Sequence, residues 1–271
     1  MNDLLLYALR AAIEAGKTII DIYQTDFEVA FKNDSSPVTK ADIQASILIK
    51  KQLSKFQLPF LSEEDNTYSY EKRSKFEFFW LVDPLDGTKE FVKRNDEFTV
   101  NIALIEQNKP VLGVVYAPMF DCMYFNFDKH AFRLQKARNI IQNQTVEEIM
   151  QSSEKLPLAQ KRDRFVVLAS RSHKTVEAEQ FIQSVVERQP NTEICQLGSS
   201  LKMCLLAECS ADIYPCFSRT SEWDTAAAHA ILNASGGKIR CVENRNETLR
   251  YNKKLLTNPF FIAESACANF L

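Results

Sequence analysis

Residues 78–91 read FFWLVDPLDGTKEF, an apolar run that ends on two aspartates three positions apart. Aromatic and branched side chains in such a run predict a buried strand. Asp83 and Asp86 stand at its carboxyl end, and Gly87 and Thr88 come directly after them. Because Asp-Pro and Asp-Gly are both common turn dipeptides, a turn and a cation site explain the stretch equally well when it is taken alone.

The spacing of the two aspartates excludes two familiar kinds of acidic site. An EF-hand loop places oxygen ligands at positions 1, 3 and 5 with glycine at 6, whereas here the acids stand at 1 and 4 and glycine at 5. A phosphatase with an aspartyl nucleophile separates its two acids by one residue, and here two residues lie between them. A divalent-cation site stays open, with Asp83, the main-chain carbonyl of Leu85 and Asp86 as ligands, because Mg²⁺ prefers carboxylates, carbonyls and water.

Other predicted elements also end or begin on acids. LSEEDN closes an apolar run with Glu63, EWDTAAAHA places Asp224 in the first turn of a helix, and SPVTKAD places Asp42 at another helix start. Each acid has a simpler interpretation, as a solvated loop residue or as a helix cap. Gly87 and Thr88 are predicted to open a helix, where free N–H groups can hold a phosphate oxygen.

The composition supplies ample material for a hydrophobic core. Of the 271 residues, 45% are hydrophobic and 25% are charged, which suits one large two-lobed domain or two small ones. The net charge is −2 and the isoelectric point about 6.0. The chain therefore lacks the basic excess of proteins that bind nucleic acid polymers, and an anionic small molecule would have to be met by local charge or by a metal.

The spacing of the cysteines and the N-terminal stretch indicate the cellular compartment in which the protein is expected. The seven cysteines form no CxxC pair and the three histidines are scattered, so zinc-site spacing is absent. We expect free thiols in a reducing cytosol rather than a disulfide framework. The stretch MNDLLLYALRAAIEAGKTIIDIY is interrupted by charges and is typical of an amphipathic helix. We expect a cytoplasmic protein without a transmembrane segment, and peripheral contact with the inner membrane stays open.

Apolar periodicity predicts two parts of different architecture. In residues 1–160 it indicates two helices, two strands that end on acids, an antiparallel hairpin around EQNKP and a third strand at DCMYFNF. In residues 161–271 strands alternate with helices, as in RFVVLAS, KTVEAEQFIQSVVER, ADIYPCF and EWDTAAAHAILNAS. The boundary is expected in the polar stretch 135–163. The side chains of the second helix expected to face inward are Ile43, Ile47, Leu48 and Leu53.

In their order along the chain, SPVTKAD, LSEED, WLVDPLDGTKEFVKRNDEFTVNIALIEQNKPVLGVVYAP and EWDTAAAHA resemble the inositol monophosphatase superfamily of Mg²⁺-dependent, lithium-sensitive phosphatases. DGTKEF, SRSH and GSSLKMCLLAE resemble its branch of 3'(2'),5'-bisphosphate nucleotidases. The similarity runs over nearly the whole chain, and the ordered set outweighs the simpler interpretation of each motif. The resemblance implies a layered α-β-α-β-α sandwich that combines α+β and α/β parts.

The resemblance also implies roles at matching positions. The implied ligands of two or three Mg²⁺ ions are Glu63, Asp83, the main-chain oxygen of Leu85, Asp86 and Asp224. The implied catalytic residues, which position and deprotonate the attacking water, are Asp42 and Thr88, together with Glu63. The implied substrate-binding residues are Glu63, Leu85, Asp86, Gly87, Thr88, His173, Gly198, Ser199, Lys202 and Asp224.

The branch resemblance implies hydrolysis of adenosine 3',5'-bisphosphate to AMP and phosphate by direct attack of water, with 3'-phosphoadenylyl sulfate as a second substrate. Both molecules belong to sulfate assimilation. Two alternatives stay open: an inositol monophosphatase with the same metal ligands, and an inactive sensor of nucleotide or metal. The chain departs from the common pattern at Cys216, Ser218 and Ala228, where arginine, glycine and glycine are usual. Monomer and homodimer are both compatible with the sequence.

Overall fold

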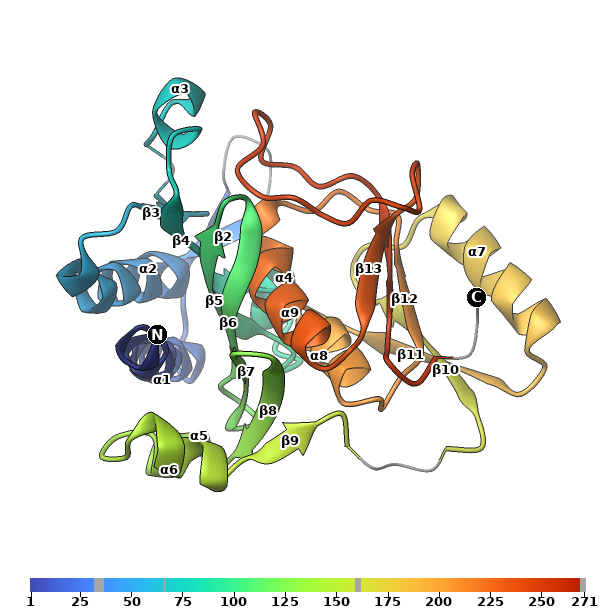
Figure 1. The fold of residues 1–271 in the computed structure, drawn as a ribbon, viewed down its shortest axis with the longest axis horizontal. Helices are drawn as coiled ribbons and strands as arrows, with labels where there is room; N and C mark the ends of the chain where they lie inside the picture. The colour runs from blue at the N-terminus through green and yellow to red at the C-terminus, as the bar shows by residue number, and fades with distance from the viewer. Residues whose placement is uncertain (32–36, 66, 159–161, 269–271) are drawn as a thin grey trace.

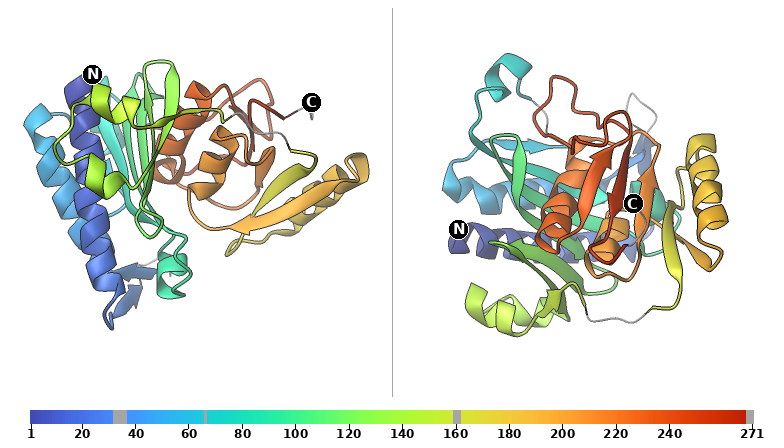
Figure 2. Two further views of the ribbon diagram at one scale, coloured as in Figure 1. Left: turned by 90° about the horizontal axis from the view of Figure 1, so that it is seen from below. Right: turned by 45° about the vertical axis from the view of Figure 1, so that its right-hand side comes forward.

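A computed structural model describes residues 1–31, 37–65, 67–158 and 162–268, and it arranges them in five layers (Figures 1 and 2). Two N-terminal helices cover one face of a seven-stranded sheet, and two helices lie between that sheet and a five-stranded one. A further helix covers the outer face of the second sheet. The five helices of these layers are α1 (Asn2–Tyr23), α2 (Lys40–Leu53), α8 (Leu201–Ala207), α9 (Glu222–Ala234) and α7 (Val176–Arg188). The expected α-β-α-β-α order is confirmed.

The seven-stranded sheet has the order β3-β4-β5-β6-β7-β8-β9, with β3 parallel to β4 and the other pairs antiparallel. Its strands are β3 (Phe60–Ser62), β4 (Phe78–Asp86), β5 (Thr99–Glu106), β6 (Lys109–Ala117), β7 (Cys122–Phe127), β8 (His130–Gln135) and β9 (Glu154–Leu156). The predicted hairpin is β5-β6, and the predicted third strand is β7. Short elements surround this sheet: β1 (Val29–Phe31), β2 (Pro37–Thr39), a 3-10 turn at Ser54–Phe56, α3 (Tyr70–Arg73), α4 (Thr88–Val92), α5 (Ala137–Ile140) and α6 (Val146–Gln151).

The five-stranded sheet has the order β11-β10-β12-β14-β13. The strands are β10 (Phe165–Ser170), β11 (Thr192–Leu197), β12 (Ile213–Cys216), β13 (Lys238–Cys241) and β14 (Phe261–Glu264). The predicted alternation of strands and helices is present, whereas β11 and β14 had no predicted counterpart. The domain boundary expected between residues 160 and 161 lies outside the described residues, so the division 1–160 and 161–271 stays a prediction.

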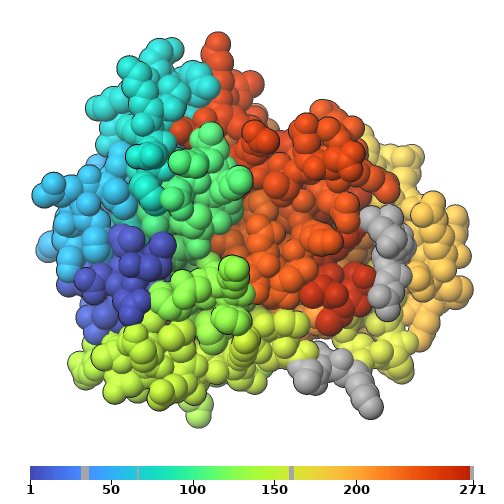
Figure 3. Space-filling model, viewed as in Figure 1, coloured from blue at the N-terminus to red at the C-terminus, as the bar shows by residue number. Residues whose placement is uncertain are grey.

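Three apolar clusters of the described residues hold the layers together. One fills the space between the α1–α2 pair and the first sheet, and a second is shared by both sheets and the two helices between them. A small third cluster lies between α7 and the second sheet. In the space-filling view, orange atoms of the C-terminal part lie directly against green atoms of the first sheet (Figure 3). Helix α9 packs on β5 and β6, and its tight contact requires Gly113, where a Cβ would come 2.1 Å from the carbonyl oxygen of Ala227. This packing fixes α9, which carries Asp224, against the strands.

The predicted inward face of α2 is wrong in part. Ile43 is 49% exposed and Ile47 is 61% exposed. Small residues, Ala41 and Ala45, are buried in their place because α2 packs along α1. Of the predicted set, Leu53 is buried.

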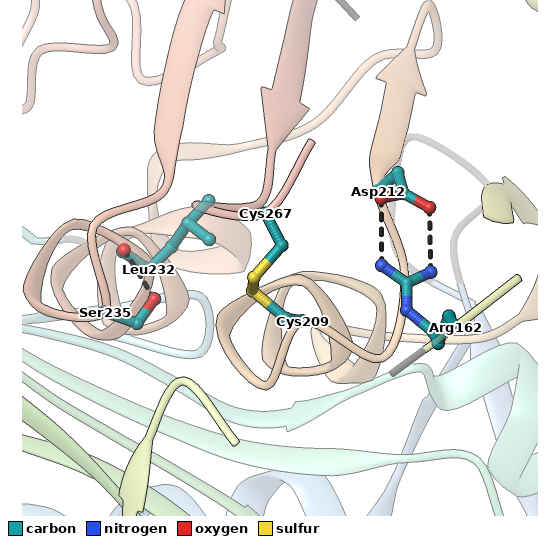
Figure 4. Close-up of a disulfide and its surroundings, with 6 residues drawn as sticks. All are labelled: Arg162, Cys209, Asp212, Leu232, Ser235 and Cys267. Carbon is teal, nitrogen blue, oxygen red and sulfur yellow. Dashed lines mark hydrogen bonds and ion pairs between the residues drawn. A yellow bond between two sulfur atoms is a disulfide. The ribbon is translucent and has the colours of Figure 1, made fainter. Parts of the chain in front are cut away.

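The expectation of seven free thiols is also wrong, because a disulfide joins Cys209 to Cys267 (Figure 4). Strands β12 and β14 pair antiparallel, so the turn before β12 and the segment after β14 meet at one end of the sheet. The two Cα atoms lie 5.8 Å apart across a sequence separation of 58. The other five cysteines are free, and Cys195 is the exposed one. Among the described helices, none has the length and apolar character to cross a membrane.

The buried His229 on α9 makes stability pH-dependent. It is 1% exposed, its Nδ1 lies 2.8 Å from the Tyr251 hydroxyl, and burial lowers its pKa from 6.5 to about 4. Between these values the unfolded chain binds a proton that the folded chain does not. We therefore expect this histidine to remove up to about 3 kcal/mol from the free energy of unfolding as the pH falls from 7 to below 4.

Urea unfolding of wild type and His229→Gln at pH 7 and pH 4.5 measures this effect. The variant should lose less stability than the wild type on acidification. His130→Gln, at an exposed position, serves as the control and should follow the wild type. Equal losses in all three proteins would contradict the prediction.

Candidate active site

Strand β4 changes register at its end and thereby presents both aspartates. Asp83 pairs with Asn101 of β5, Asp86 pairs with Thr99, and the ladder shifts between them. Pro84, which lies in this interval, has no N–H to donate to the ladder. The Leu85 N–H instead donates to Oδ1 of Asp83 at 3.1 Å. The bend therefore directs two carboxylates and their intervening carbonyls to one end of the sheet.

Three carboxylates converge at this point. Glu63, Asp83 and Asp224 each offer an oxygen within 4.8 Å of the others. Glu63 follows β3, which is parallel to β4. The acids at the carboxyl ends of these two strands therefore lie side by side. Asp224 comes from the first turn of α9. Burial raises the pKa of Asp83 well above its usual value, and the negative charges of Glu63, Asp86 and Asp224 raise it further.

The pKa of Asp224 is raised well above its usual value for the same reasons, first burial and then the charges of Asp86 and Glu63. Carboxylates held this close repel one another, and a divalent cation would offset the repulsion. Carboxylate and carbonyl oxygens are the donors that Mg²⁺ prefers. The donor set therefore fits Mg²⁺ better than a soft metal, for which thiolate or imidazole ligands would be needed.

Asp86 lines the same cleft and is held by hydrogen bonds from both halves of the chain. Its Oδ2 accepts the Ser200 N–H at 2.7 Å and the Asn101 side-chain amide at 3.2 Å. The Ser200 hydroxyl lies 2.8 Å from Asp86 Oδ2 and 2.7 Å from the carbonyl oxygen of Asp224, and it can donate to one of them at a time. Sequence reasoning missed Asn101 and Ser200. An asparagine inside the apolar run TVNIAL was the available signal for Asn101.

Asp42 combines a capping role with a place beside the site. Its Oδ2 accepts the N–H and the hydroxyl of Thr39, both at 2.7 Å, which closes a capping box at the start of α2. Its Oδ1 accepts the Thr88 hydroxyl at 3.0 Å. Burial raises the pKa of Asp42, and the hydrogen bonds from Thr39 and Thr88 oppose that rise. The helix-cap interpretation is therefore correct for Asp42, and the contact with Thr88 exists beside it.

Helix α4 begins where β4 ends. Its N-terminal cap is Gly87, whose φ of 91° lies in the left-handed region that glycine tolerates. A Cβ at this position would also approach the Glu97 carbonyl oxygen at 3.1 Å. Thr88 is the first residue of the helix, as predicted, and glycine is required for the turn that places it next to Asp42.

A cleft of about 230 Å³ between the two sheets contains almost all predicted site residues. Those that line it are Glu63, Asp83, Leu85, Asp86, Gly87, Thr88, His173, Gly198, Ser199, Lys202 and Asp224. Asp42 does not line this cleft and contacts it through Thr88. Ser218 and Arg219 line it as well, while Cys216 and Ala228 are buried.

Cationic and neutral polar groups line the part of the cleft next to Asp86. Lys202 is 6% exposed and donates to the carbonyls of Leu197 and Ser199 at 3.2 and 2.6 Å. Burial lowers the pKa of Lys202, opposed by the charge of Asp86. Lys89 Nζ lies 2.8 Å from His173 Nε2. This side of the cleft therefore suits an anionic ligand.

The cleft continues into a second pocket of about 250 Å³ under α7. The two share His173, Tyr214, Ser170 and Ser218. The walls of the second pocket include the apolar side chains of Ala178, Ile182, Ile194, Pro215 and Phe217. The cleft beside the acids and this pocket therefore form adjoining spaces that one extended ligand can occupy.

Comparisons with known proteins identify the family of this chain. The model of the inositol monophosphatase family matches residues 1–269. The chain is 43% identical over 255 residues to the 3'(2'),5'-bisphosphate nucleotidase CysQ of Salmonella typhimurium, covering 92% of this chain and 95% of the relative. It is 42% identical over 232 residues to the protein of the same name from Escherichia coli K12, covering 84% and 86%. The crystal structure of CysQ from Bacteroides thetaiotaomicron superposes with a TM-score of 0.91 at 42% identity, over 98% of each chain. The chain belongs to the inositol monophosphatase family.

Proposed function

We propose that this chain is a Mg²⁺-dependent phosphatase that hydrolyses adenosine 3',5'-bisphosphate to AMP and phosphate, and that it also accepts 3'-phosphoadenylyl sulfate. One observation carries the proposal: the carboxylates of Glu63, Asp83 and Asp224 converge in a cleft that Thr88 also lines and that opens into an apolar pocket. The two curated relatives described above are both named 3'(2'),5'-bisphosphate nucleotidases, and their names support the choice of substrate. A cytoplasmic location and a role in sulfate assimilation belong to the same proposal.

In this proposal Glu63, Asp83, the Leu85 carbonyl, Asp86 and Asp224 hold two or three Mg²⁺ ions. Bound Mg²⁺ would lower the pKa of a coordinated water and neutralise charge on the phosphate and the leaving oxygen. The convergence of hard oxygen donors supports this assignment.

The attacking water is oriented by Thr88 and Asp42. The Thr88 hydroxyl donates a hydrogen bond to Asp42 Oδ1, so its oxygen remains available as an acceptor toward the cleft. In this proposal a water that donates to this oxygen would attack the phosphorus opposite the leaving group. Asp42 is buried and its pKa is raised, which makes it a better proton acceptor than an exposed aspartate. No protein nucleophile takes part in this scheme.

The backbone N–H groups of Gly87 and Thr88 are proposed to hold the oxygens of the reacting phosphate. The loop of Gly198 and Ser199, with Lys202 and His173, is proposed to bind the remainder of the nucleotide. Lys202 and Lys89 line the cleft and would supply positive charge to the second phosphate. The base would occupy the pocket under α7. An inositol phosphate has no group to fill that apolar pocket, which is the specific reason to prefer a nucleotide.

The test is a comparison of kcat/KM for adenosine 3',5'-bisphosphate and for inositol 1-phosphate, both with Mg²⁺. We expect a preference of about a hundredfold or more for the nucleotide, because burial of the base adds binding energy that inositol cannot supply. Equal or reversed preference would favour an inositol monophosphatase. Release of phosphate from neither substrate, with nucleotide binding intact, would favour a sensor.

The variant Ala178→Phe makes the same test sharper. Ala178 lines the pocket under α7, and a phenyl group there should raise KM for the nucleotide about tenfold while turnover of inositol 1-phosphate stays the same. Val176→Phe is the matched control, because Val176 is on the same helix and 65% exposed. An unchanged KM for the nucleotide in Ala178→Phe would show that the base does not bind in this pocket.

A further inference from the structure

Glu97 links the first sheet to the second half of the chain through three hydrogen bonds. It precedes β5 and is 9% exposed. Its carboxylate accepts Nε and Nη2 of Arg171, each at 2.7 Å, and the Gly198 N–H at 2.7 Å. Two parallel bonds from one guanidinium form the strongest type of carboxylate pair. None of these three residues has a part in water activation in the scheme above.

Arg171 is fixed on its other side to the end of β11. Its Nη2 also donates to the Gln196 carbonyl at 2.7 Å, and its backbone N–H donates to the Leu197 carbonyl at 3.3 Å. Arg171 follows β10, which is parallel to β11. The guanidinium therefore holds the exits of both strands against Glu97.

The loop that follows β11 is tightly packed. At Gly198 a Cβ would lie 2.9 Å from the Glu97 carbonyl oxygen and 2.5 Å from Cγ of Glu90. The next residue, Ser199, has a φ of 45°, in the left-handed region. Contacts with Glu97 and Glu90 thus determine where this loop runs.

Two residues beyond Gly198, the same loop reaches the acidic cluster. Ser200 donates its N–H to Asp86, and its hydroxyl lies within hydrogen-bond distance of Asp86 and of the Asp224 carbonyl. A shift of Gly198 would therefore move Ser200 and release Asp86. Glu97 is thus connected to Asp86 by its hydrogen bond to Gly198, by the backbone from Gly198 to Ser200, and by the hydrogen bond from Ser200 to Asp86.

We propose that Glu97 and Arg171 are a positioning pair: they set the loop 198–200 and, through Ser200, the orientation of Asp86 for metal binding. The inference rests on the proposed function in one respect, the role of Asp86 and Asp224 as metal ligands. Its distinguishing feature is that loss of the pair weakens Mg²⁺ binding, whereas a pair that only joined the two parts of the fold would affect stability alone.

The structure contains a matched control pair. Asp212 accepts hydrogen bonds from Nη1 and Nη2 of Arg162 at 2.7 and 2.9 Å (Figure 4). It also accepts the Val166 N–H at 2.7 Å. It is 5% exposed, so its chemistry and burial resemble those of Glu97. It precedes β12, at the opposite end of that strand from Ser218, which lines the cleft. Loss of the Arg162–Asp212 pair should destabilise the fold without changing the positions of the carboxylates in the cleft.

The experiment compares wild type, Glu97→Gln and Asp212→Asn in the full chain, with Mg²⁺ titrated into each protein in a calorimeter and thermal unfolding recorded. Both variants should have a lower Tm. Glu97→Gln should raise the Kd for Mg²⁺ about tenfold, as replacement of a group that orients metal ligands typically does, and Asp212→Asn should leave it unchanged.

Equal Mg²⁺ affinity in Glu97→Gln and Asp212→Asn would overturn the inference. If Glu97→Gln does not fold, Arg171→Lys replaces it: this variant keeps the charge, loses the paired hydrogen bonds, and should also weaken Mg²⁺ binding several-fold. The readout needs no substrate, so failure of the nucleotidase proposal is detected separately, as absence of phosphate release by wild type that still binds Mg²⁺. A wild type that binds no Mg²⁺ would overturn the inference together with the metal site.

Discussion

Asp83→Asn should lower kcat/KM for adenosine 3',5'-bisphosphate by at least about a thousandfold. Asp83 is 1% exposed and its carboxylate is within reach of both Glu63 and Asp224. The amide removes one ligand charge from the centre of the cluster while its oxygen can still accept the Leu85 N–H. The loss should therefore reflect metal binding and catalysis rather than unfolding.

Stability separates these two explanations. In the metal-free protein, Asp83 adds to the repulsion among the carboxylates, so the metal-free variant should melt at or above the temperature of the metal-free wild type. Saturating Mg²⁺, at about a hundred times its Kd, should stabilise the wild type by about 2.7 kcal/mol and the variant much less. A variant with normal activity, or one as strongly stabilised by Mg²⁺ as the wild type, would contradict the site assignment.

Thr88→Ala should lower kcat by about a hundredfold to a thousandfold while KM and the Kd for Mg²⁺ change little. The variant removes the hydroxyl that donates to Asp42 and leaves the proposed metal ligands in place. Thr88 begins α4, where alanine is tolerated, so the fold should be retained. The kinetic signature differs from that of Asp83→Asn, in which Mg²⁺ binding is lost.

Thr88→Ser is the matched control, because serine restores the hydroxyl without the methyl group. We expect it to recover most of the activity, within about tenfold of wild type. If Thr88→Ala turned over within about threefold of wild type, the water would be oriented by another group, and the assigned roles of Thr88 and Asp42 would be wrong.

The sequence allowed a good prediction of the elements that carry the site because local signals mark them. An apolar run that ends on Asp83 and Asp86 predicts a strand with two acids at its end, and the position of Asp42 at a helix start indicates a helix cap. The cap is present, and β4 ends on Asp86. The motifs occur in the same order as in a known family, and this resemblance predicted the layered fold.

Contacts between distant segments were not predictable in the same way. Ser200 holds Asp86 across a sequence separation of 114, and Glu97 holds Gly198 across 101. No local pattern identifies such partners, because ordinary turn and strand residues fulfil these roles. The disulfide between Cys209 and Cys267 depends likewise on the antiparallel pairing of β12 and β14.

The buried face of α2 was mispredicted for a different physical reason. Periodicity assigns the largest apolar side chains to the core, and Ile43 and Ile47 satisfied it. The close approach of α1 and α2 instead selected alanines, and the site selected Asp42. Apolar side chains on the outer face of a surface helix are ordinary, and the sequence offers no sign that distinguishes them from core residues.

The most direct test of the account is the rate of AMP formation from adenosine 3',5'-bisphosphate by the purified wild-type protein, with Mg²⁺ and with a chelator. The account predicts equal amounts of AMP and phosphate in the presence of Mg²⁺, and loss of both products when the metal is removed. Product formation that persists in the chelator, or no AMP at saturating Mg²⁺ and nucleotide, would contradict it.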